Sequence, residues 1–124
     1  MTIRNANVYG FYYGVFLVSA SQNTISGNNI TTNDIGVVLI SSSDYNNVVG
    51  NNVKQNNAYG FYVDSSSYNN IYHNNFADNI QQVFTSYSTN IWDHGYPAEE
   101  TTGMTMEALT QRAVPAKTIW EATA

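Results

Sequence analysis

Residues 23–52 read NTISGNNITTNDIGVVLISSSDYNNVVGNN, a stretch that begins and ends on nearly the same phrase. NTISGNN returns as NNVVGNN, and it returns again within NNIYHNNFADN, which starts at residue 69. Such self-similarity at a fixed period is the signature of a repeat architecture. The residues that keep a spacing of 23 are Asn23, Asn46, Asn69; Ile25, Val48, Ile71; Asn28, Asn51, Asn74; Asn29, Asn52, Asn75; and Asn33, Asn56, Asn79. A degenerate first copy starts near Ile3, and the last copy ends near Asn90.

Alternating apolar residues in each copy predict strands rather than helices. In GVVLI, Val37 and Leu39 point to one face and Val38 and Ile40 to the other, because side chains alternate along a strand. Asparagine and glycine are poor helix formers, which argues against helical hairpin repeats. The inward positions form four columns: Ile3, Ile25, Val48, Ile71; Val8, Ile30, Val53, Phe76; Val15, Val37, Phe61, Val83; and Leu17, Leu39, Val63, Thr85. Stacked coil upon coil, these columns predict an all-β, short parallel β-helix of about four coils.

The recurring asparagines have a structural interpretation in this fold. An asparagine side chain carries both a donor and an acceptor and tolerates left-handed backbone angles, so repeated copies can bond to one another from coil to coil. We therefore expect structural ladders formed by Asn23, Asn46, Asn69 and Asn90 and by Asn33, Asn56 and Asn79. Gly14, Gly36 and Gly60 mark a corner before the long strand, where a positive φ or close contact between coils is needed.

Composition excludes several classes of function. The 124 residues contain no cysteine, which rules out disulfides and thiolate metal sites, and the net charge is -5 with only four basic residues. A nucleic-acid groove needs a clustered basic face, so we expect no nucleic-acid partner. No apolar run is long enough to cross a membrane, and no signal peptide stands at the start, so we expect no membrane insertion.

The repeats and the segment NIWDHGYP that follows them resemble the parallel β-helix repeats of NosD-like proteins. These repeats belong to a wider set of carbohydrate-binding and sugar-hydrolase β-helix domains in archaeal and bacterial surface proteins. The resemblance implies a right-handed β-helix over residues 1–97, in line with the usual hand of parallel crossovers, and a secreted or cell-surface location. Residues 98–124 depart from it. In that tail, a short helix over MEALTQRA, capped by Thr102 or Thr105 and ended by Pro115, is expected to cap the solenoid or to pack on its flank.

The chain has few residues of the types that catalysis or copper binding requires. Lyases and hydrolases on this fold need convergent carboxylates, yet the aspartates of the repeats, Asp34, Asp44, Asp64 and Asp78, share no column. Copper needs two or three His, Met or Cys donors in one place. His73 is alone in the column of Gly27 and Gly50, His94 lies in the terminal WDHGYP turn, and Met104 and Met106 fit a helical core better. We expect no catalytic residue, no metal ligand and no cofactor. A degenerate polysaccharide-processing enzyme and a copper-associated NosD-like accessory protein stay as alternatives.

The outward face of the long strands is unexpectedly apolar. Phe16, Val38, Tyr62 and Phe84 should stack in one exposed column, with Val18, Ile40 and Asp64 beside it. Such a stripe usually marks a contact surface. The tail, another subunit, the rest of a longer protein or a sugar could cover it. The candidate carbohydrate-binding residues are Phe16, Tyr62, Phe84, Tyr12 and Tyr59. Open solenoid ends further predict self-association or continuation into a longer β-helix protein. The leading hypothesis is a non-catalytic surface or secreted module that binds carbohydrate or a protein, or that serves as a scaffold.

Overall fold

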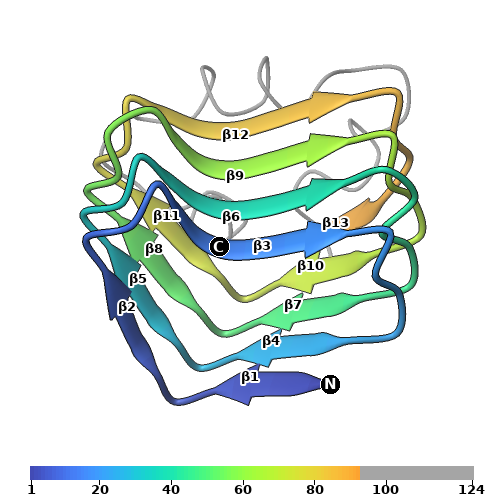
Figure 1. The fold of residues 1–124 in the computed structure, drawn as a ribbon, viewed down its shortest axis with the longest axis horizontal. Coiled ribbons are helices and arrows are strands. Elements are labelled where there is room, and N and C mark those ends of the chain that lie inside the picture. Colours follow the sequence, from blue (N-terminus) through green and yellow to red (C-terminus); the bar gives the residue numbers. More distant parts are fainter. Residues whose placement is uncertain (93–124) are drawn as a thin grey trace.

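The computed structural model describes residues 1–92, which form a parallel β-helix of four coils and the start of a fifth. Each coil contributes one strand to each of three parallel sheets (Figure 1). The first sheet contains β1 (Thr2–Arg4), β4 (Thr24–Ser26), β7 (Asn47–Val49), β10 (Asn70–Tyr72) and β13 (Ile91–Trp92). The second contains β2 (Asn7–Tyr9), β5 (Asn29–Thr31), β8 (Asn52–Lys54) and β11 (Asn75–Ala77). The third, called here the long-strand sheet, contains β3 (Tyr13–Val18), β6 (Ile35–Ile40), β9 (Tyr59–Asp64) and β12 (Gln81–Ser86).

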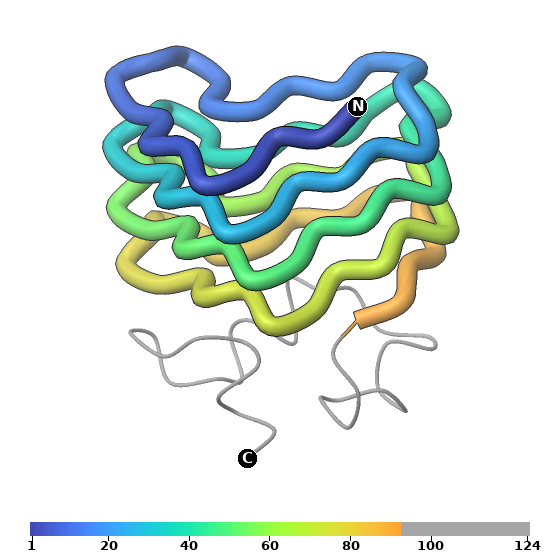
Figure 2. The backbone as a smooth tube through the Cα atoms, turned by 90° about the horizontal axis from the view of Figure 1, so that it is seen from below, coloured from blue at the N-terminus to red at the C-terminus, as the bar shows by residue number. Residues whose placement is uncertain are grey.

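The coil is right-handed. In Figure 1 the chain runs clockwise from β1 through β2 to β3. Figure 2 shows the same molecule from below, with the front of Figure 1 at the top, and its coils follow one another downwards from the N-terminal coil. The chain therefore turns clockwise as it moves away from the viewer of Figure 1, which is a right-handed coil. The fold class, the coil number and the repeat over the described residues are confirmed. Residues 1–92 contain no helix that is long and apolar enough to cross a membrane. The predicted tail helix and the boundary at residue 97 lie outside the described residues.

The core follows the four predicted columns, except that Thr85 is not part of it and Trp92 adds to it. The strand registers pair Ile3 with Ile25 and Ile25 with Val48, and they pair Val15 with Val37 and Val37 with Phe61. The members from the middle coils are fully enclosed, since Val37, Val48 and Phe61 have no exposed surface. Phe61 also contacts Phe76 and Trp92 edge-to-face, with ring centroids 5.7 and 6.1 Å apart. Uniform strand spacing along the axis therefore produces one continuous apolar interior.

Three buried asparagine ladders line the corners of the coils. Both predicted ladders are present, and a third runs through Asn28, Asn51 and Asn74, whose spacing the sequence showed without revealing its role. In each ladder one side-chain oxygen accepts from the backbone N–H and from the side-chain amide of its counterpart in the previous coil. The Nδ2 of Asn46, for example, lies 3.0 Å from the Oδ1 of Asn69. These bonds satisfy corner groups that the sheets leave without partners.

Left-handed backbone falls on the residue before each ladder asparagine except Asn90, although asparagine itself tolerates such angles. Among the ladder asparagines none has a positive φ, whereas Gly27, Gly50 and His73 have φ values of 64°, 68° and 55°. The left-handed residue turns the chain, and the asparagine that follows points inward. The extra residue of the second coil is accommodated in the same manner, because Ser41 and Ser42 are both left-handed.

Gly14, Gly36 and Gly60 are present for close contact and not for a positive φ. Each is the second residue of a long strand, and none appears among the left-handed glycines. A Cβ on Gly36 would lie 2.6 Å from the carbonyl oxygen of Gly60, and one on Gly14 would lie 2.5 Å from that of Gly36. The sequence suggested either a positive φ or close contact between coils for these glycines, and the structure supports close contact.

Candidate functional site

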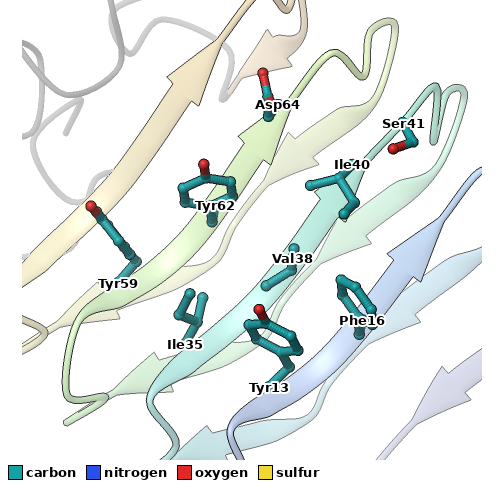
Figure 3. A pocket seen from close by; sticks show the side chains of 9 residues that line it. All are labelled: Tyr13, Phe16, Ile35, Val38, Ile40, Ser41, Tyr59, Tyr62 and Asp64. Atoms are coloured by element: carbon teal, nitrogen blue, oxygen red, sulfur yellow. The ribbon is translucent and has the colours of Figure 1, made fainter.

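A shallow hollow of about 480 Å³ lies on the outer face of the long-strand sheet. Its lining comes from three neighbouring strands and from the corner that follows β6, as Figure 3 shows. Tyr13 and Phe16 project from β3 on one side, and Tyr59 and Tyr62 project from β9 on the other. The remaining lining residues are Ile35, Val38, Ile40, Ser41 and Asp64. The hollow therefore has aromatic sides and a largely aliphatic floor.

Side-chain volume explains why a hollow forms on this sheet. The register places Val38 between Phe16 and Tyr62, and it places Ile35 between Tyr13 and Tyr59. The second coil thus carries small aliphatic side chains where its neighbours carry rings. Val38 is only 3% exposed although it points outward, whereas Phe16 is 45% exposed. The rings rise above the valine and leave a depression between the first and third coils.

Ring contacts organise the two aromatic sides. Tyr13 and Phe16 stack at a centroid distance of 4.6 Å, and Tyr62 stacks on Phe84 of the next coil at 4.8 Å. Tyr59 meets Tyr62 edge-on at 5.4 Å. Offset stacks and edge-to-face contacts are the favoured arrangements of aromatic pairs, so each pair restrains the rings that flank the hollow.

The five predicted carbohydrate-binding residues have different positions relative to the hollow. Phe16, Tyr59 and Tyr62 line it. Phe84 is not in the lining but supports Tyr62 from behind, and Tyr12 lies outside it, 66% exposed, with an edge-on contact to Tyr13.

The binding-residue prediction did not include Tyr13, Ile35 and Ser41. It also left out three lining residues that had been placed only in or beside the apolar stripe, Val38, Ile40 and Asp64. Ile35 lies two residues before the inward-facing Val37, so strict alternation would place it inside. It lines the outer hollow because the alternation breaks at Gly36, whose Cβ would also point into the core, towards Val53. Alternation could therefore not have identified Ile35. Ser41 belongs to the left-handed corner after β6, whose path could not be inferred from periodicity.

Asp64 and Ser41 lie where β9 and β6 end, at one end of the hollow (Figure 3). Burial raises the pKa of the Tyr62 hydroxyl above its ordinary value, and the negative charge of Asp64 raises this pKa further. The field of the carboxylate therefore reaches the aromatic side of the hollow. Among residues 1–92, the hydrogen bond to the Asp64 carboxylate comes from the hydroxyl of Ser65, at 3.3 Å.

The sequence of this chain matches a protein family. The family model described as "Periplasmic copper-binding protein (NosD)" matches residues 1–107. The chain belongs to the NosD family. The resemblance read from the repeats is thus confirmed. Searches of curated proteins and of solved structures each returned no significant match.

The family's description raises the question of copper, which we tested on the donors present. The chain has no cysteine, and no three residues of the types His, Asp and Glu gather within the described part of the chain. His73 stands at a left-handed corner, with its ring 5.3 Å from that of Tyr72. Copper prefers several imidazole or sulfur donors together. Residues 1–92 therefore do not by themselves supply the set of donors that copper prefers, and His94, Met104 and Met106 lie outside the described residues.

Proposed function

We propose that this NosD-like β-helix is a non-catalytic module that binds carbohydrate in the hollow of its long-strand sheet. One observation carries the proposal: a concave site on paired strands is lined by four aromatic side chains, those of Tyr13, Phe16, Tyr59 and Tyr62. Aromatic side chains supply apolar area for the C–H faces of a sugar ring, and the tyrosine hydroxyls supply hydrogen bonds at its edge. Phe84 stacks on one face of the Tyr62 ring, so a sugar in the hollow would pack on the other face.

The carboxylates support a binding role over a catalytic one. Glycoside hydrolysis needs two carboxyl groups that flank one bond. Of the aspartates in residues 1–92, only Asp64 lines the hollow. The Oδ1 of Asp34 accepts from Asn57 and that of Asp44 from the backbone of Ser67, in separate corners. Asp78 stands in the left-handed position before Asn79.

We further propose a location outside the cytoplasm. The support is the family's description, which names a periplasmic protein, together with the polymeric sugars that such a location offers as ligands.

The test is a glycan array followed by titration calorimetry on the whole chain and its variants. Tyr62→Ala and Phe16→Ala each remove one aromatic side of the hollow, and we expect each to weaken binding about tenfold, or about 1.4 kcal/mol. Tyr45→Ala is the matched control, because Tyr45 is 59% exposed and stacks on Tyr68 at a different corner. A blank array, or equal losses in all three variants, would contradict the proposal and favour a protein partner for this face.

A further inference from the structure

The charge around the hollow is one-sided. Asp64 supplies a carboxylate, whereas the lysine and arginine side chains of residues 1–92, Lys54 and Arg4, belong to β8 and β1. Those strands lie in the other two sheets, so neither cation shares a face with the hollow. A ligand in the hollow therefore meets negative charge without a compensating positive group from the described residues.

Within the described residues, the Asp64 carboxylate has acceptor capacity left for a ligand. Its contact in residues 1–92 is the 3.3 Å bond from the neighbouring Ser65 hydroxyl, at the long end of the hydrogen-bond range. No lysine, arginine or histidine of the described residues forms an ion pair with it. A carboxylate retains acceptor sites for further donors after one such bond.

The aromatic rings of the hollow also favour a positively charged ligand. The negative faces of tyrosine and phenylalanine rings attract ammonium groups, and this attraction grows where water is excluded. Phe16 and Tyr62 stand on successive sides of Val38, two strand spacings apart, which is about 9.6 Å between backbones. Two rings at that separation leave room for a puckered sugar ring between or across them.

Resting on the proposed carbohydrate function, we propose that the hollow recognises amino sugars, pyranoses that carry a free ammonium group. The ammonium donates to the Asp64 carboxylate, and the C–H face of the sugar packs on Tyr62 and Phe16. Uronic acids are excluded by like charge. The ligand class thereby differs from the anionic polymers that polysaccharide lyases cleave.

The experiment compares three oligosaccharides by titration calorimetry on the whole chain: a glucosamine tetramer, its fully N-acetylated form, and a galacturonate trimer. At about pH 5.5 the glucosamine amine is protonated. We expect the glucosamine tetramer to bind about tenfold more tightly than the acetylated one, and we expect the galacturonate trimer not to bind. Added salt should weaken the glucosamine complex and leave the acetylated complex unchanged.

Two variants assign the preference to its residue. Asp64→Asn should lower the glucosamine affinity to that of the acetylated tetramer without changing the latter, whereas Asp44→Asn, on another corner, should change neither. Equal affinity of the wild-type chain for the two tetramers would overturn the amino-sugar inference and leave carbohydrate binding intact. Failure of all three to bind a folded chain would overturn both proposals. Tighter binding of galacturonate would overturn the charge argument.

Discussion

At the scale of the residue, buried asparagine performs at the corners the task that strand pairing performs between them. The Oδ1 of Asn51 accepts from the backbone N–H and the Nδ2 of Asn28, both at 3.0 Å. Its Nδ2 donates to the carbonyl of Ile25 at 2.8 Å and to the Oδ1 of Asn74 at 2.9 Å. This side chain of the third coil thus satisfies polar groups of the second and fourth coils, in a site that is 1% exposed. Since unsatisfied buried groups are costly, this residue has no apolar substitute.

Replacing Asn51 with alanine should therefore lower the free energy of unfolding by about 2–4 kcal/mol, because two buried donors of Asn28 lose their acceptor. The matched control is Asn52→Ala on the next residue. Asn52 belongs to a second row of asparagines, outside the buried ladder. Its Nδ2 donates to the Oδ1 of Asn29 at 2.8 Å in an exposed position, where water can replace the bond. We expect Asn52→Ala to cost less than about 1 kcal/mol. Urea denaturation measures both, and similar losses would refute the structural role of the inner ladder.

Tyr62 makes stability depend on pH in the alkaline range. Its pKa in the folded chain is raised, first by burial and then by the Asp64 charge. Above about pH 10 the unfolded chain therefore releases this proton while the folded chain still holds it, so stability falls as pH rises. Below about pH 10 both the folded and the unfolded chain hold this proton, so stability does not change with pH through Tyr62. Tyr62→Phe should reduce the alkaline loss of stability, because it removes the group whose pKa is raised. Urea denaturation between about pH 9 and pH 11 measures this loss, and an alkaline loss unchanged by Tyr62→Phe would contradict this account.

At the scale of the element, the long strands approach one another most closely at their glycines. The backbone carbonyl of each following coil occupies the space that a Cβ would need, as at Gly36, where the distance is 2.6 Å. A backbone atom in a paired strand cannot move aside without breaking the ladder of hydrogen bonds around it. The last coil has Gln82 at this position, and its Oε1 accepts from the Nδ2 of Asn79 at 2.8 Å.

Gly36→Ala should therefore destabilise the chain by about 1–3 kcal/mol through overpacking. Gly50→Asn serves as the control, because nothing lies within 4 Å of a Cβ there and asparagine tolerates the φ of 68°. We expect that variant to stay within about 1 kcal/mol of the wild type. Thermal unfolding followed by circular dichroism compares the two, and equal melting temperatures would show that coil contact does not explain the glycine column.

At the scale of the whole molecule, the solenoid is a series of neighbour interactions. Each coil pairs with the coils directly before and after it in all three sheets. In such arrays, stability is approximately a sum of coil terms and nearest-neighbour terms. Energetic coupling between substitutions should then decay with the number of coils between them.

Double-mutant cycles test this decay in one core column. Val37 and Phe61 are register partners on β6 and β9, so Val37→Ala and Phe61→Leu should couple by more than about 0.5 kcal/mol. Val15 and Val83 lie on β3 and β12, with two strands between them. Val15→Ala and Val83→Ala should add within about 0.5 kcal/mol. Strong coupling of the distant pair in urea denaturation would contradict the nearest-neighbour description.

Much of the fold was predictable because its information repeats. The period of 23 placed Ile25 against Val48 and Asn46 against Asn69, and strand alternation placed Phe61 inside and Tyr62 outside. The left-handed corners were not predictable in the same way, because residues as different as Gly27, Gly50 and His73 occupy one corner position. Their shared φ is imposed by the turn and by the ladder asparagine that follows, and not by their own preferences.

The sequence by itself determined the parallel β-helix, the residues of its core columns and the outward position of its aromatic stripe, because periodicity and alternation are properties of the chain order alone. Only the tertiary structure decided where that stripe is hollow and what charge borders it. The hollow exists because rings from β3 and β9 rise on either side of Val38, and the charge is one-sided because Asp64 shares this face while Arg4 and Lys54 do not. Both facts depend on side chains from different coils in one place, which no single repeat contains.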